Sequence, residues 1–111
     1  MSASSPSPTR SAAAHAAWLA QVREEPLDPE RPIIDPHHHL WTDAEGRVPY
    51  LLADLWADTG SGHRITKTVF IQCGASHRSE GPDHLKPVGE TEFVARIARA
   101  SREGGGGAVI A

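Results

Sequence analysis

The sequence predicts an α/β fold with a parallel sheet, because strand-like and helix-like segments alternate along it. Residues 32–35, 67–73 and 108–111 have the apolar, β-branched composition of strands. Between them, residues 50–59 and 90–102 carry apolar side chains at helical spacing. This order is that of βαβ units, whose crossovers are right-handed. It leaves open whether the sheet is an open doubly wound sheet or the start of a barrel.

The first 30 residues are expected to form a tail, a short helix and a linker before the domain of residues 31–111. Met1–Ala14 is rich in Ser, Ala and Pro and lacks the apolar centre of a secretory signal, so it is predicted to be a disordered tail. Ser11 is a suitable N-cap for a helix that runs to about Val22 and is stopped by Pro26.

The strand at 67–73 is the clearest of the three. Its centre, Val69–Ile71, is continuously apolar rather than alternating, which predicts a strand covered on both faces. The long loop after it, residues 74–89, has a length that is often functional. In the helix at 90–102 the acidic pair Glu90 and Glu92 suits the N-terminal end of the helix dipole. The glycine run Gly104–Gly107 is expected to be a flexible turn.

Composition excludes several classes of function. The chain has 111 residues, 39% of them hydrophobic, which suits one small domain with a modest core. A net charge of −3 with scattered basic residues indicates no nucleic-acid partner, and no apolar run approaches the roughly 20 residues that span a bilayer. The single cysteine excludes an internal disulfide, and a reducing, cytoplasmic setting is expected. The expected partner is a small molecule.

The segment Asp35–Trp41 (DPHHHLW) is the strongest functional motif. Alternate side chains of a strand share a face, so His37 and His39 are predicted to lie side by side while His38 points away. Two imidazoles at this spacing can bind one metal ion. The alternative for this segment is a polar turn without chemistry.

Four other side chains are candidates for the same site. Asp35 either orients an imidazole or only bonds the backbone at the strand end. Gln72 ends the second predicted strand and can reach a substrate oxygen. Trp41 either walls the pocket or packs in the core, and Arg78 either clamps a substrate carboxylate or is solvated. Cys73 is expected to be a small buried side chain rather than a nucleophile.

The segment Ile33–Trp41 resembles the first strand of the amidohydrolase superfamily, and more narrowly its amidohydrolase-related branch (amidohydrolase 2), which includes lactonases and decarboxylases. Tyr50–Leu55, Asp58–Gly60 and Gly89–Phe93 also resemble that branch, so the resemblance covers roughly residues 30 to 111.

The resemblance implies a (β/α)₈ TIM-type barrel with His37 and His39 at its C-terminal mouth, holding a divalent ion, zinc or manganese. It implies a hydrolase in which a polarised carbonyl of a lactone, or of another carboxylic ester or amide, is attacked by an activated water. A metal-dependent decarboxylase of an aromatic acid is the neighbouring reaction. Some lactonases of the branch are thought to work without a metal, and the two histidines would then orient the substrate.

The chain is shorter than the family's fold. A (β/α)₈ barrel takes about 250 residues, so we expect an N-terminal fragment with only the first βα units, inactive or nearly so alone. Two other readings stay open: a non-catalytic truncated chain that binds metal weakly, and an open-sheet binding module.

Overall fold

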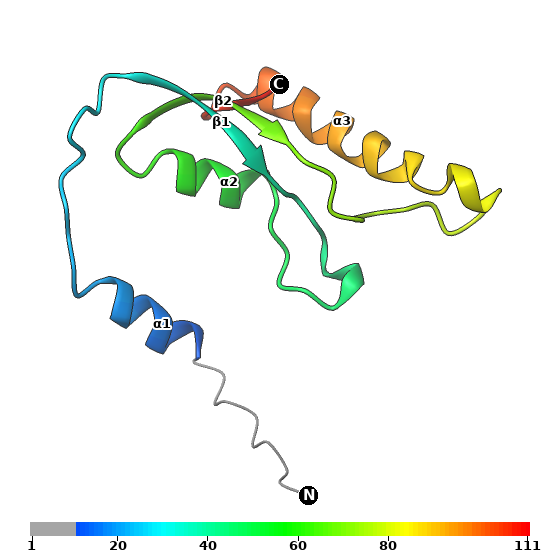
Figure 1. Ribbon diagram of the computed structural model, residues 1–111, viewed down its shortest axis with the longest axis horizontal. Coiled ribbons are helices and arrows are strands. Elements are labelled where there is room, and N and C mark those ends of the chain that lie inside the picture. The colour runs from blue at the N-terminus through cyan, green and yellow to red at the C-terminus, as the bar shows by residue number, and fades with distance from the viewer. Residues whose placement is uncertain (1–10) are drawn as a thin grey trace, which may run out of the picture.

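Strands and helices alternate in the computed structural model of the chain, which describes residues 11–111. In chain order the elements are α1 (Ala12–Leu19), β1 (Pro32–His38), α2 (Leu52–Thr59), β2 (Arg64–Phe70), α3 (Val88–Gly104) and β3 (Val109–Ile110), with 3-10 turns at Asp43–Glu45 and Asp83–Leu85 (Figure 1). The predicted disordered tail lies outside the described residues up to residue 10. The helix predicted after Ser11 is present as α1, although it ends at Leu19 rather than near Val22, and residues 12–14 belong to it rather than to the predicted tail.

The three strands form one parallel sheet in the order β1-β2-β3. This confirms the α/β class and the parallel pairing of the strands. Two helices separate the strands along the chain, α2 between β1 and β2 and α3 between β2 and β3. The carboxyl ends of β1 and β2 therefore lie at the same edge of the sheet, where the predicted site residues follow them.

β1 is an edge strand with irregular pairing. Its register against β2 shifts between Ile33 and Ile34 and again between Asp35 and His38. Pro36 lies in the second irregularity, and proline is tolerated at bulges and on edge strands because it has no N–H to donate. β1 was predicted to end at Asp35, but it continues through His38.

β2 spans residues 64–70, whereas the sequence predicted 67–73. It starts earlier because its first residues pair with the start of β1. It ends earlier because the N–H groups of Cys73 and Ala75 donate to the side chain of Glu90 rather than to a neighbouring strand. The expectation that Val69–Ile71 is covered on both faces is also wrong, because Val69 and Phe70 are only half-buried and Ile71 is exposed.

Both crossover helices contribute to one core. Leu55 of α2 and Phe93 of α3 are buried together with Leu40, Ala75 and Ile110. α2 begins later than predicted because the backbone of Tyr50 pairs with that of Trp41 in an antiparallel bridge. α3 extends beyond the predicted 90–102 at both ends.

The glycine run at the end of α3 forms the predicted turn, with Gly105 in the left-handed conformation, and it lies against an indole ring. A Cβ added at Gly107 would lie 2.7 Å from Cδ1 of Trp56, and one added at Gly106 would overlap the same indole ring. The indole Nε1 also donates to the carbonyl of Ala108 at 2.9 Å. Trp56 of α2 thus lies directly on the backbone that joins α3 to β3.

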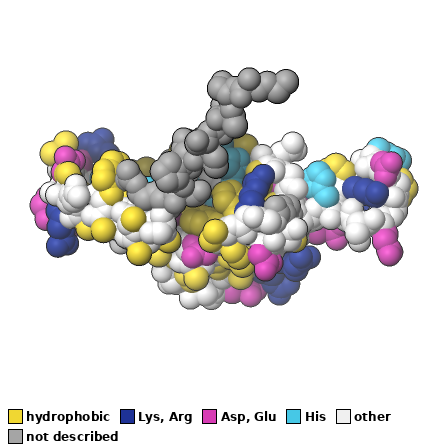
Figure 2. Space-filling model, turned by 90° about the horizontal axis from the view of Figure 1, so that it is seen from below, with side chains coloured by type: hydrophobic (Ala, Val, Ile, Leu, Met, Phe, Trp, Pro, Cys, Tyr) yellow, Lys and Arg dark blue, Asp and Glu magenta, His cyan; other side chains and the backbone are white. Residues whose placement is uncertain are grey.

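α1 stands apart from the sheet (Figure 1). The predicted N-cap is confirmed, because Ala14 N donates to Oγ of Ser11 at 3.1 Å. No residue of α1 is buried, and Trp18 and Leu19 are 53% and 55% exposed. Among residues 11–111, no helix has the length and apolar character needed to cross a membrane. On the face shown in Figure 2, basic and acidic side chains are interspersed.

Candidate functional site

The two outer histidines of the motif lie side by side at the end of β1. Nε2 of His37 is 3.3 Å from Nε2 of His39, and the rings meet edge to face with centroids 5.0 Å apart. His37 is exposed and His39 half-buried. The structure therefore has the side-by-side arrangement that the alternation of a strand predicts.

The ring of His39 is held in one orientation by the chain that follows β2. Its Nδ1 lies 2.7 Å from the carbonyl oxygen of Ile71. A carbonyl only accepts hydrogen bonds, so Nδ1 is the protonated nitrogen, and the lone pair on Nε2 of the neutral ring faces Nε2 of His37 at 3.3 Å. A backbone carbonyl behind the second ring nitrogen is the usual support of a metal-binding histidine.

His38 confirms the prediction that it points away from the pair. It is 8% exposed, and its Nε2 lies 3.0 Å from Oγ1 of the buried Thr68 on β2. Its Nδ1 is buried with no hydrogen-bond partner among the described residues. Burial lowers the pKa of His38, partly offset by the charge of Asp35.

Asp35 contacts the backbone of the motif rather than an imidazole. Its Oδ1 accepts a hydrogen bond from the N–H of His37 at 3.0 Å. Of the two roles weighed for this side chain, the structure shows the bond to the backbone at the strand end. The carboxylate thereby fixes the main chain from which the His37 ring projects.

Trp41 lies beside the pair and also packs against the core. Its ring centroid is 6.4 Å from that of His39, and its Nε1 donates to the carbonyl of Val48 at 2.6 Å. The guanidinium of Arg47 lies over the indole at 5.2 Å. Both roles weighed for Trp41 are therefore compatible with its position.

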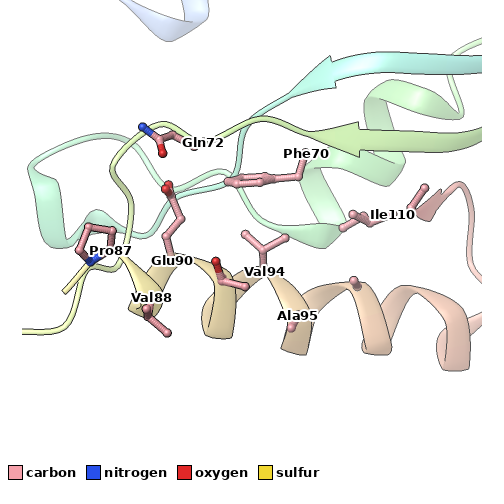
Figure 3. A pocket seen from close by; sticks show the side chains of 11 residues that line it. Phe70, Gln72, Pro87, Val88, Glu90, Val94, Ala95 and Ile110 are labelled. Atoms are coloured by element: carbon pink, nitrogen blue, oxygen red, sulfur yellow. The ribbon is translucent and has the colours of Figure 1, made fainter. Parts of the chain in front are cut away.

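Gln72 lies in the segment after β2 and not at the strand end that was predicted. It lines a groove of about 590 Å³ between the sheet and α3 (Figure 3). The other lining residues are Phe70, Pro87, Val88, Glu90, Thr91, Val94, Ala95, Ala98, Ile110 and Ala111. His37 and His39 are not among them, so the structure does not bring Gln72 and the histidine pair into one cavity.

Arg78 is engaged in an ion pair. Its guanidinium contacts Oε1 of Glu92 on α3, with Nε at 2.6 Å, and its backbone N–H donates to the carbonyl of Lys86. Both partners of the ion pair are about half exposed. The side chain is thus tied to α3, which leaves the carboxylate-clamp role without support from its contacts.

The sequence did not predict that Glu90 is buried beside the predicted site. It was assigned to the helix dipole, but it is 4% exposed and its Oε2 accepts hydrogen bonds from Cys73 N at 3.0 Å and Ala75 N at 2.7 Å. Burial by itself would raise the pKa of Glu90, but the donors from Cys73 and Ala75 hold it below its ordinary value. In the sequence, the glycine that precedes it, Gly89, is the feature that points to this buried carboxylate.

Gly89 allows the loop to lie against the first turn of α3. A Cβ there would lie 2.5 Å from the carbonyl oxygen of Ser76 and 2.6 Å from the N of Arg78. A glycine followed by an acidic residue at the start of this helix thus marks a close approach of backbone to backbone. Together, Gly89 and Glu90 fix the loop that follows β2.

Cys73 is half-buried, in line with the expected small packing side chain. Burial raises the pKa of its thiol, and the Sγ lies 3.7 Å from the carbonyl of Leu40. A raised pKa disfavours the thiolate, so Cys73 is unsuited to act as a nucleophile.

The histidine pair fits two positions of a metal site. With Zn–N bonds of about 2.0–2.1 Å and a tetrahedral angle, two ligand nitrogens lie about 3.3 Å apart, which matches the Nε2–Nε2 distance of 3.3 Å. Within residues 11–111, no cluster of three or more His, Cys, Asp or Glu side chains is arranged to hold a metal ion. The pair is therefore a partial donor set.

Comparison with known proteins gave no significant match to a family model, to a curated protein or to a solved structure. The resemblance of residues 30–111 to the amidohydrolase-related branch therefore stays a prediction.

Proposed function

We propose that this chain contributes the first βα units of a (β/α)₈ barrel hydrolase, and that His37 and His39 are two ligands of its divalent metal ion. The substrate class is a lactone or another carboxylic ester or amide. The observation that carries the proposal is the pair of Nε2 atoms 3.3 Å apart, with the His39 ring oriented by the Ile71 carbonyl.

The sheet supports the barrel part of the proposal. Its strands are parallel and in sequence order, which is how a (β/α)₈ barrel is built. Ile34 of β1 and Ile71 after β2 are 59% and 37% exposed. Large apolar side chains on an uncovered part of a sheet suit a surface that further strands would enclose.

The roles of the chain's own residues follow from their contacts. A divalent ion at this position would supply Lewis acidity, polarising a carbonyl and lowering the pKa of a water. His37 and His39 would hold the ion through Nε2, Asp35 fixes the backbone at His37, and Trp41 lies beside the His39 ring with the ring centroids 6.4 Å apart. A catalytic zinc normally has three protein ligands, so in this proposal further strands of the barrel supply the rest.

Metal titration tests the proposal. Zinc and manganese binding would be measured by calorimetry for the wild type and for His37→Ala and His39→Ala, with His63→Ala as control because His63 is exposed on another part of the chain. Either motif substitution is expected to lower the metal affinity at least about tenfold. This factor is the lower end of the range for losing an interaction that supports a metal site. Equal affinity in all four proteins would contradict the metal site.

Turnover is measured separately, by following acid release from a panel of lactones with and without the metal, and little hydrolysis is expected from this chain alone because the proposal leaves at least one metal ligand to further strands. Metal-dependent hydrolysis that is lost in His39→Ala and kept in His63→Ala supports the hydrolase. Hydrolysis that persists in both motif variants would assign the reaction to other residues.

A further inference from the structure

The buried carboxylate of Glu90 lies outside the histidine pair but is connected to it through the chain that follows β2. Figure 3 shows the side chain rising from α3 toward the segment that carries Gln72. Glu90 is 4% exposed, and a buried carboxylate is costly unless it is well bonded. Its two strongest partners are backbone N–H groups of that segment, and the Cys73 thiol and the His77 charge contribute less.

The same segment holds the His39 ring. Two residues before Cys73, the carbonyl of Ile71 lies 2.7 Å from Nδ1 of His39. A second connection runs from Sγ of Cys73 to the carbonyl of Leu40, 3.7 Å away, directly after His39 in the sequence. The loop that Glu90 fixes therefore touches the motif at a ring nitrogen and at the main chain.

The Glu90 carboxylate provides the hydrogen-bond acceptor that a neighbouring strand would otherwise provide for this segment. Beyond Phe70 the chain leaves the β2 ladder, although Ile71 N still donates to His38 O at 2.8 Å. The N–H groups of Cys73 and Ala75 would otherwise be unpaired, at a cost of about 1–3 kcal/mol for each buried group. One oxygen of Glu90 accepts both, so it sets the path of the segment that presents the Ile71 carbonyl.

We propose that Glu90 is a positioning residue for the histidine pair: by fixing the loop after β2 it holds the Ile71 carbonyl against His39 and keeps the Nε2 lone pair of His39 directed toward His37. The part of this inference that concerns metal affinity rests on the proposed function. The part that concerns the orientation and protonated nitrogen of His39 does not.

The test compares two substitutions of Glu90 with a matched control on the same helix. Glu90→Asp withdraws the carboxylate by one methylene, whereas Glu90→Gln keeps its reach and one acceptor oxygen. Ser101→Ala is the control: Ser101 is fully buried on α3, but its Oγ accepts from Ile110 N of β3 rather than from the loop after β2.

The first readout is the protonation of the imidazole nitrogens in the metal-free chain, from long-range ¹H–¹⁵N spectra. His39 is expected to be protonated at Nδ1 in the wild type, in Glu90→Gln and in Ser101→Ala, and to become a mixture of tautomers in Glu90→Asp. A pure Nδ1–H tautomer in Glu90→Asp would overturn the inference. A mixture in Glu90→Gln equal to that in Glu90→Asp, or a mixture in Ser101→Ala, would overturn it as well.

The second readout is zinc affinity by calorimetry. Glu90→Asp is expected to lose about tenfold, the lower end for residues that support a metal ligand, while Ser101→Ala keeps the wild-type affinity. If the wild type binds no zinc, the proposed function fails and the tautomer comparison still decides the role of Glu90. If the wild type binds zinc and Glu90→Asp binds it equally well, the inference fails alone.

Discussion

Three consecutive histidines have three different environments, and the difference comes from the strand that carries them. His37 and His39 project together on one side of β1, while His38 is buried on the other side against Thr68. The alternation of side chains along an extended chain predicts this division, and the Ile71 carbonyl holds the His39 ring in its orientation. The chemistry of the motif therefore depends on β1 continuing to His38.

Thr68→Val tests the support behind the motif. The substitution keeps the shape of the side chain but leaves His38 with neither ring nitrogen bonded to a described residue, since Nδ1 already lacks a partner there. The free energy of unfolding is expected to fall by about 1–3 kcal/mol, the cost of an unpaired buried polar group. Urea unfolding followed by circular dichroism measures it.

Thr66→Val is the control on the same strand, because its half-buried hydroxyl donates to the Ile33 carbonyl at 3.3 Å. Its expected cost is smaller, about 0.5–1.5 kcal/mol, the net contribution of an ordinary hydrogen bond. Equal losses in the two variants would contradict a special role of the Thr68–His38 contact.

Glu90 predicts a pH dependence of stability. The pKa of the folded carboxyl is depressed, since the donors from Cys73 and Ala75, with the nearby charge of His77, outweigh burial. Its stabilisation is therefore full above the ordinary glutamate pKa of about 4.3 and is lost as the pH falls through the lower folded value.

The measurement is the difference in unfolding free energy between the wild type and Glu90→Gln as a function of pH. The wild-type advantage is expected to be constant near neutrality and to shrink below about pH 4. An advantage that grows as the pH falls would contradict the depressed pKa.

At the scale of the elements, α2 contacts the end of α3 through an interaction that the sequence pattern does not predict. Trp56 lies on the backbone of the glycine run and donates to Ala108 O. Glycine is required at Gly106 and Gly107 by the close approach of the ring, whereas Gly105 adopts the left-handed conformation, with φ of 61°, at the end of the helix.

Gly106→Ala tests this contact. A methyl group would overlap the Trp56 ring, and overpacking of this kind costs about 1–3 kcal/mol. In a Trp56→Phe background the smaller ring leaves room, so the same substitution is expected to cost less. A double-mutant cycle of urea unfolding free energies measures the difference, and additive losses would contradict direct packing.

The molecule as a whole is a three-stranded sheet with two packed helices, from which α1 stands apart (Figure 1). α1 has no buried residue, and Val22 beyond it is 69% exposed. The exposed apolar side chains of Trp18, Leu19 and Val22 are therefore not part of the core around Leu40.

Deletion of residues 1–22 removes α1 and is expected to change the unfolding free energy by less than about 0.5 kcal/mol, as for changes away from packed features. Circular dichroism in urea measures it, with loss of helical signal but an unchanged midpoint. A drop of the midpoint equal to that of Thr68→Val would show that α1 packs on the domain in solution.

The sequence determined the order of the elements and the direction of the motif's side chains. Both depend on local rules: the periodicity of apolar residues predicts α2 and α3, and alternation along β1 predicts the His37–His39 pair and the reversed His38. The location of the strongest motif at the end of β1 follows from the same rules.

Only the tertiary structure decided where the strands end and which polar groups are buried. The segment after β2 leaves the sheet where Glu90, distant in sequence, accepts the N–H groups of Cys73 and Ala75, and Arg78 is paired with Glu92 across the same loop. The glycine run lies against an indole from another helix. Periodicity carries no information on such contacts, because they depend on which surfaces meet after the chain has folded.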